Sequence, residues 1–169
     1  MTKTQICIAL AIGWLSQTTF AYKIFGTEMP VDLILIVVIF SALNRGPIFG
    51  LWTGTLGGVV QDLLSGGIIG VSGLAKSVVG VLLGFTGSHF ILMTMWHRAV
   101  VVFLASLIHS FLFLLIYEIV GSSFQNTDNS WILLIAIFNV IVGLVLEILF
   151  RFMPGFFGRM RWGRSVFNL

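Results

Sequence analysis

Long apolar runs separated by short polar loops make up most of this chain and constrain its fold more than any other feature. The runs fall at residues 4–22, 31–43, 47–64, 71–93, 99–120 and 131–152. A transmembrane helix needs roughly 20 apolar residues to cross the ~30 Å hydrocarbon layer of a bilayer. With 169 residues, of which 9% are charged, the chain has no room for a soluble domain. We therefore predict an all-α polytopic membrane protein, with a six-helix transmembrane bundle over residues 1–152 and a tail at 153–169.

The first apolar run contains polar residues near its end, at Gln17, Thr18 and Thr19, and further runs follow it. We therefore expect a retained first span and not a cleaved signal peptide. Cys7 lies in this run and is the only cysteine of the chain, so neither a disulfide framework nor a cysteine-rich metal site is expected.

Basic residues are distributed unevenly between the two sides of the predicted bundle. If the runs alternate in direction, one side carries Lys23 with Glu28, and the other side carries the remaining basic residues except Lys76, which lies inside the fourth run. The latter are Lys3, Arg45, Arg98, Arg151, Arg159, Arg161 and Arg164. Because basic loops stay in the cytoplasm, we expect both termini to be cytoplasmic.

The second run, residues 31–43, is short for a span. At 1.5 Å per residue it forms about 20 Å of helix, and the polar and turn-forming residues Asn44, Arg45, Gly46 and Pro47 follow it directly. Either the bilayer thins around it, or it forms a hairpin with the third run inside the protein.

Glycines recur every four residues from just before the third run onward, at Gly46, Gly50, Gly54 and Gly58. On a helix with 3.6 residues per turn this spacing makes a slowly winding strip without side chains. Helices in lipid associate by close van der Waals packing, and such small-residue strips are where their backbones approach. Two interpretations remain open: packing within the bundle, or a docking face for a helix of another protein.

Asp62 continues the four-residue spacing and precedes the glycine-rich loop "SGGIIG". Its carboxylate could be solvated or accept hydrogen bonds from backbone N–H groups of that loop. Alternatively, it pairs with Lys76, which lies five residues into the fourth run and needs either a partner or an outward path.

Residues 30–84 closely resemble the MreD family of rod-shape-determining membrane proteins. The family has a Pro/Asp start to an apolar span, a glycine-spaced span, a D-L-[LI]-S-G block, a nearby glycine and a small-residue span. Asp62, Ser65, Gly66 and Gly70 match the block and the glycine that follows it. Asp32 corresponds to the acidic residue of the span start, although here it is separated from the proline by one residue.

The resemblance implies a non-enzymatic scaffold of the elongasome, the cell-elongation machinery, in the bacterial inner (cytoplasmic) membrane. Such a protein binds MreC, and through it couples MreB filaments to peptidoglycan synthesis by RodA and a class B penicillin-binding transpeptidase. The resemblance also implies a fold similar to the six-helix S component of energy-coupling-factor transporters. The alternative function is therefore a membrane protein that binds a small molecule or lipid in a central pocket, with Trp52 and Asn139 in its lining.

The remaining polar residues of the spans do not indicate a catalytic, cofactor or metal site. We do not expect a catalytic triad of Ser65, His109 and Asp62, because His109 should lie well below the loop that follows Asp62. For His109 we favour a neutral, hydrogen-bonded core histidine over a ligand or proton relay. Glu147 precedes Arg151 by four residues, a spacing that favours an ion pair on one helix.

The tail interleaves arginines with aromatic residues, among them Arg159, Arg161, Trp162 and Arg164. Cations are attracted to anionic lipid head groups and aromatic rings settle at the membrane interface, so we expect the tail to lie on the membrane surface. Docking to a cytoplasmic filament such as MreB is the other interpretation. Nucleic-acid binding is not expected, since topology already accounts for the basic residues.

Overall fold

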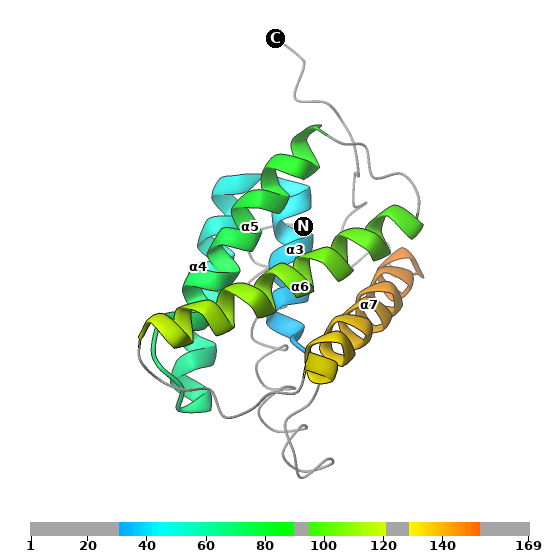
Figure 1. Ribbon diagram of the computed structural model, residues 1–169. Coiled ribbons are helices and arrows are strands. Elements are labelled where there is room, and N and C mark those ends of the chain that lie inside the picture. Colours follow the sequence, from blue (N-terminus) through cyan, green and yellow to red (C-terminus); the bar gives the residue numbers. More distant parts are fainter. Residues whose placement is uncertain (1–30, 90–94, 121–128, 153–169) are drawn as a thin grey trace.

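The structure is a computed structural model that describes residues 31–89, 95–120 and 129–152 (Figure 1). This part of the chain is all-helical, as predicted. Its five helices are α3 (Leu33–Arg45), α4 (Pro47–Ser65), α5 (Val71–His89), α6 (Met95–Ile119) and α7 (Asn129–Phe152). The predicted first span at 4–22 and the tail at 153–169, with Arg159, Arg161, Trp162 and Arg164, lie outside the described residues.

The five helices correspond to the last five predicted runs, with shifted ends. Within the described residues, one helical segment, Trp96–Ile119 of α6, is both long and apolar enough to cross a membrane. The apolar helices at Leu33–Arg45, Val71–Gly87 and Ile132–Ile148 are shorter. The chain is thus an α-helical protein with a membrane-spanning helix, and the full count of six spans stays a prediction.

The connection between α3 and α4 is a single residue. Gly46 follows the last residue of α3 with φ +89°, a backbone conformation that glycine adopts without steric cost, and Pro47 then begins α4. Proline suits a first helical position because its fixed φ is already helical and its missing N–H would have no partner there. The two helices therefore form a tight hairpin.

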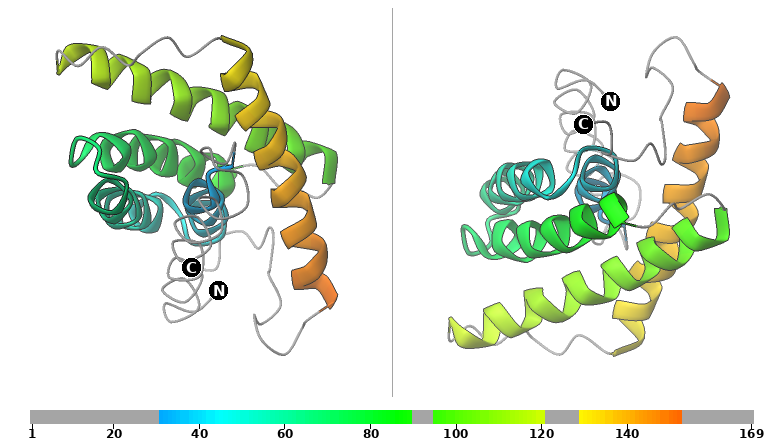
Figure 2. Two further views of the ribbon diagram at one scale, coloured as in Figure 1. Left: turned by 90° about the horizontal axis from the view of Figure 1, so that it is seen from below. Right: turned by 90° about the horizontal axis from the view of Figure 1, so that it is seen from above.

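Two groups of helices make up the described structure. Helices α3, α4 and α5 lie side by side, and α6 crosses α5 and α3 obliquely, with α7 in contact with α6 and crossing it obliquely (Figures 1 and 2). We call these groups the α3–α5 unit and the α6–α7 pair. A cluster of buried apolar side chains lies between the two groups, and its members are Leu35, Ile39, Ala42, Val79, Leu83, Val102 and Ala105.

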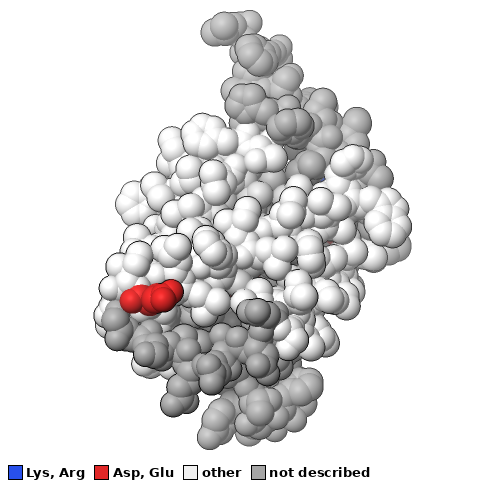
Figure 3. Space-filling model, in the orientation of Figure 1, with Lys and Arg blue, Asp and Glu red and all other residues white. Residues whose placement is uncertain are grey.

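The outer surface of the described helices is apolar, and the face in Figure 3 is almost uncharged. Exposed large side chains recur along α4, as at Ile48, Trp52 and Leu56, and along α5, as at Leu74 and Leu82. In a water-soluble protein such an exterior would be unusual, whereas acyl chains solvate it without cost. The surface therefore agrees with a membrane environment.

Candidate functional site

The glycine strip of α4 is a packing face inside the chain. A Cβ atom added to Gly54 would lie 2.6 Å from the carbonyl carbon and oxygen of Lys76 in α5. Cβ atoms added to Gly50 or Gly58 would likewise collide with the backbone of α5. Because these collisions are with backbone atoms, no side-chain movement could relieve them. Three of the four predicted glycines thus bring two helix backbones into direct contact.

Two corrections to the sequence interpretation follow. Gly46 differs from the other three, because it forms the α3–α4 turn and a Cβ added to it would meet nothing within 4 Å, although its backbone lies against Gly84 of α5. The strip formed by Gly50, Gly54 and Gly58 is also not a docking face for another protein, because α5 already covers it. Of the two interpretations left open above, packing within the bundle is the correct one.

Helix α5 carries matching glycines that the sequence interpretation did not single out. Gly80 lies against the backbone of Gly50, and Gly84 lies against the backbone of Pro47. Hydroxyl groups add to this contact: the Oγ1 of Thr55 and the Oγ of Ser77 are 2.7 Å apart. The recurrence of glycine in the run at 71–93 was the available signal, since two glycine strips that face each other allow the closest approach of helices.

Asp62 closes the α4–α5 turn. Its buried carboxylate accepts hydrogen bonds through Oδ2 from the backbone N–H groups of Gly70 (2.8 Å) and Ser72 (3.1 Å). These groups lie at the start of α5, where helical N–H groups have no partner within the helix. Gly66 and Gly70 have φ values of +69° and +99°, which let the chain turn back tightly. Asp62 therefore caps α5 from the end of the preceding helix.

The predicted pair between Asp62 and Lys76 is not formed. The Nζ atom of Lys76, which is fully buried, lies 2.6 Å from Oδ2 of Asp32. The other carboxylate oxygen, Oδ1 of Asp32, accepts a hydrogen bond from the N–H of Leu35 (2.9 Å) and so caps α3. The partner of Lys76 is thus the acidic residue at the start of α3, which lies 44 positions before it (76 − 32).

His109 lies beside this ion pair. Its Nε2 atom is 3.2 Å from Nζ of Lys76 and 3.9 Å from Oδ2 of Asp32. An ammonium group can only donate, so Nε2 must be the acceptor and the proton of the neutral ring must be on Nδ1. His109 is therefore a buried, hydrogen-bonded core histidine.

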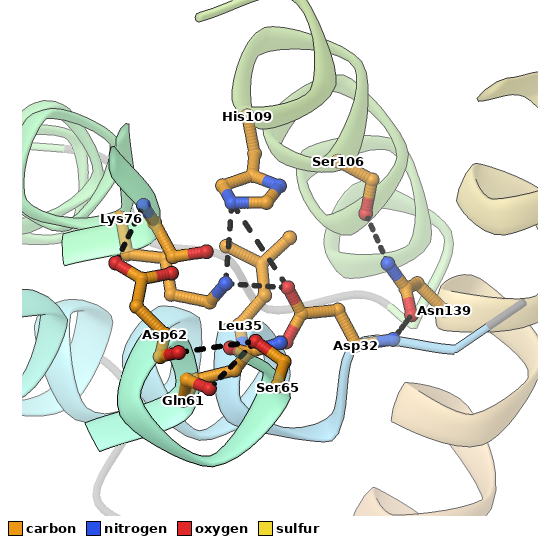
Figure 4. A network of polar contacts seen from close by, with 10 residues as sticks. Asp32, Leu35, Gln61, Asp62, Ser65, Lys76, Ser106, His109 and Asn139 are labelled. Atoms are coloured by element: carbon orange, nitrogen blue, oxygen red, sulfur yellow. Dashed lines mark hydrogen bonds and ion pairs between the residues drawn. The ribbon is translucent and has the colours of Figure 1, made fainter. Parts of the chain in front are cut away.

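Asn139 of α7 extends the contacts to a fourth helix. Its Oδ1 accepts a hydrogen bond from the N–H of Asp32 (2.8 Å), and its Nδ2 donates to Oγ of Ser106 in α6 (3.1 Å). We call the connected side chains of Asp32, Lys76, Ser106, His109 and Asn139 the polar joint (Figure 4). The joint ties the α3–α5 unit to both helices of the α6–α7 pair.

The pocket predicted to contain Trp52 and Asn139 is not supported. Asn139 is fully buried and accepts a hydrogen bond from the N–H of Asp32, whereas Trp52 is 60% exposed on the outer side of α4. The two side chains therefore do not line a common site.

Glu147 of α7 forms a buried ion pair with Arg98 in the first turn of α6. Sequence spacing could not identify Arg98 as the partner, because the two residues are far apart along the chain. The predicted contact with Arg151 involves a side chain outside the described ones.

The three residues considered as a catalytic triad, Ser65, His109 and Asp62, make separate contacts with other groups. Asp62 caps α5, His109 accepts from Lys76, and Oγ of Ser65 donates to the carbonyl of Gln61 in its own helix (2.8 Å). In the ranges that the structure describes, no three His, Cys, Asp or Glu side chains are grouped as metal ligands.

Comparison with models of protein families identifies the family of the chain. The model of the family described as rod shape-determining protein MreD matches residues 2–153. The chain belongs to the MreD family. The match extends well beyond residues 30–84, on which the resemblance was based, and it includes every residue of the polar joint and of the α4–α5 turn. No curated protein and no solved structure matches the chain, so the similarity to S components stays a prediction.

Membership assigns this MreD protein a role in rod-shape determination and places it in a family of structural proteins that determine shape. The geometry agrees with such a role, because the polar side chains of the α4–α5 turn and of the joint hold helices together. What these residues can do chemically is cap helices, pair charges and fix the approach of helices.

Proposed function

We propose that this MreD protein is a non-enzymatic scaffold of the bacterial elongation machinery. It crosses the inner membrane six times with both termini in the cytoplasm and binds MreC. Through MreC it helps to couple MreB filaments to peptidoglycan synthesis by RodA and a class B penicillin-binding transpeptidase. The single observation that carries the proposal is the match of the MreD family model to residues 2–153.

The structure supports the proposal through the surfaces that remain exposed. Since α5 covers the glycine strip, a partner helix must contact the outward sides of the helices, such as the row formed by Ile48, Trp52 and Leu56 on α4. Contacts of this kind in lipid consist of van der Waals packing with few hydrogen bonds, each worth about 0.6 kcal/mol. Affinity for MreC would then be spread over many residues.

Depletion and replacement test the proposal directly. A rod-shaped bacterium depleted of its own MreD would express this chain with an affinity tag, together with an MreC protein from the same source as the chain. We expect the cells to stay rod-shaped and MreC to co-purify with the tagged chain. Round cells and no recovered MreC, despite normal amounts of the chain in the membrane, would contradict the scaffold role.

The alternative is a membrane protein of S-component type that binds a small molecule or a lipid. The two residues predicted to line its pocket do not favour it, since Asn139 belongs to the polar joint and Trp52 is 60% exposed on α4. Native mass spectrometry of the detergent-purified protein distinguishes the two functions. A retained ligand of vitamin size would support the binder, whereas co-purified MreC supports the scaffold.

A further inference from the structure

The polar joint stands at the boundary between the α3–α5 unit and the α6–α7 pair. Asp32 and Lys76 belong to the first, and Ser106, His109 and Asn139 belong to the second. The residues come together from four separate helices or helix starts, and Figure 4 shows their side chains converging on one place. The joint is therefore the polar part of the contact between the two groups of helices.

Stability alone does not account for a buried ion pair at this boundary. Removing two charges from water is costly, and replacing a buried pair by neutral residues of similar volume is often neutral or stabilising. The Lys76 side chain is completely buried and that of Asp32 is 12% exposed, so the pair bears this cost nearly in full. Ionisable residues kept inside a membrane bundle are therefore candidates for a functional role.

The contacts of the joint can separate one at a time. Lys76 has three N–H donors on a flexible stem, and two of its contacts are with Asp32 (2.6 Å) and His109 (3.2 Å). The contact with His109 can open while the contact with Asp32 keeps the charge paired. The apolar contacts across this boundary are made by side chains, among them Val102 and Ala105 of α6. The glycine-to-backbone contacts of the described residues lie within the α3–α5 unit, so a shift of α6 would not have to break them.

We propose that the polar joint is a switchable contact of this MreD protein. Lys76 stays paired with Asp32 while its hydrogen bond to His109 opens and closes. This opening, together with that of the hydrogen bond from the N–H of Asp32 to Asn139, lets the α6–α7 pair shift against the α3–α5 unit and changes the surface that the two groups offer together. The inference rests on the proposed scaffold function, because the shifted surface would be the one that a partner in the membrane recognises.

The test measures the separation of the two groups in the full-length chain. Spin labels would be placed at Leu82 in α5 and Leu104 in α6, which are about half exposed, in a Cys7→Ser background. Distance distributions would be recorded in lipid nanodiscs, and the same variants, without labels, would be tested for restoring rod shape. Thermal unfolding in detergent would show which variants remain folded.

The decisive variant neutralises the ion pair without leaving a charge behind, as in the double substitution Asp32→Asn and Lys76→Met. We expect it to fold with a thermal midpoint near that of the unmodified chain, to lose the rod-restoring activity, and to broaden the α5–α6 distance distribution. Full restoration of rod shape with an unchanged α5–α6 distance distribution would show that the joint has only a packing role, and would overturn the proposal.

His109→Leu provides a second route if the double variant does not fold. It removes the acceptor of Lys76 and leaves the ion pair intact, so we expect a folded protein with a broadened distribution, whereas His109→Gln keeps an acceptor and should behave like the unmodified chain. Thr53→Val is the matched control, because it removes the contact with Oγ of Ser41 (2.8 Å) inside the α3–α5 unit. An unchanged distribution in His109→Leu, or an equal broadening in Thr53→Val, would contradict the proposal.

Failure of this inference and failure of the scaffold function can be told apart. If MreC does not co-purify but the joint variants broaden the distance distribution, the scaffold proposal fails and the switchable contact stands. If MreC co-purifies equally with all folded variants and their distributions stay narrow, only the switchable contact fails.

Discussion

The α4–α5 interface and the boundary between the α3–α5 unit and the α6–α7 pair are held together by different kinds of contact. Between α4 and α5, glycines bring the backbones into contact, and the hydroxyls of Thr55 and Ser77 add a neutral contact, while the carboxylate of Asp62 contributes at the turn. At the boundary between the α3–α5 unit and the α6–α7 pair, a buried ion pair, a histidine and an amide make the polar contacts. The first interface depends on absent side chains, and the second depends on present ones, both the buried apolar cluster and the end groups of the polar joint.

This difference separates a rigid part of the molecule from an adjustable one. Backbone contact has one geometry, because moving either helix creates a collision or a gap. Contacts between end groups tolerate small shifts, since a lysine or asparagine side chain can rotate and still reach a partner. The α3–α5 unit is therefore suited to act as a fixed frame, and the α6–α7 pair is suited to move on it.

The largest expected effect comes from breaking the backbone interface. Gly54→Leu would place a side chain where the carbonyl of Lys76 lies 2.6 Å from the new Cβ atom, so α4 and α5 could not pack. We expect little or no folded protein in the membrane and no rod shape, a far stronger effect than that of His109→Ala. Yield of monodisperse protein in detergent and cell shape would measure it.

Leu56→Phe is the matched control for that substitution, because it adds volume to a side chain of α4 that is 55% exposed. It should leave the yield unchanged. Equal tolerance of Gly54→Leu and Leu56→Phe would show that the glycine interface is not what holds α4 to α5.

The second effect concerns the charged contact between α6 and α7. Arg98→Gln leaves the buried carboxylate of Glu147 without its arginine, and breaking a buried pair from one side costs about 3–5 kcal/mol. We expect a marked drop in the thermal midpoint, measured in detergent. The double substitution Arg98→Gln and Glu147→Gln should recover most of the loss, and a double variant as unstable as the single one would argue against the pair.

A smaller effect is expected at the α4–α5 turn. Asp62→Ala removes the acceptor of the N–H groups of Gly70 and Ser72, and losing such a cap costs about 0.5–2 kcal/mol. Asp62→Asn keeps an oxygen that can accept, so it should lose less. Thermal unfolding of both variants would test the order, and an asparagine variant as unstable as the alanine variant would show that the negative charge matters more than the hydrogen bonds.

The smallest effect is expected at a contact between α6 and the α4–α5 turn. The hydroxyl of Tyr117 accepts a hydrogen bond from the N–H of Ile68 at 3.3 Å. Tyr117→Phe keeps the ring, whose centroid lies 4.8 Å from that of Phe113, and removes only the hydroxyl. We expect a loss of about 0.5–1.5 kcal/mol. No change in thermal unfolding would indicate that water replaces the hydroxyl at this exposed end.

The helices and the glycine interface were predictable because their signals are local. Runs of apolar residues predict helices wherever they are long enough, and a four-residue glycine spacing predicts a smooth helix face in any context. The interpretation of Asp62 as an acceptor for the following turn was available for the same reason, since its donors Gly70 and Ser72 lie within ten positions. The contrary interpretation, a pair with Lys76, was equally local and proved wrong.

The polar joint and the Arg98–Glu147 pair were not predictable from spacing. The sequence interpretation considered only Asp62 as the partner of Lys76. The pairing with Asp32 depends on where the start of α3 lies beside α5, which spacing does not reveal. The sequence signal for Asp32 was its correspondence to the acidic residue that the family has at the start of this span, which indicated neither the cap nor the partner that the structure shows. Asn139 was taken for the lining of a pocket because nothing local reveals which buried group an amide will hold.

The sequence by itself determined that this chain is helical, belongs in a membrane and brings two helices together through glycine, because composition and spacing act over one or two helical turns. Only the tertiary structure decided that the glycine strip is covered from within, that Lys76 pairs with Asp32, and that four helix segments meet in one polar joint. The physical reason is that a buried charge must be satisfied by whichever group the packing brings to it. Packing is a property of the whole bundle.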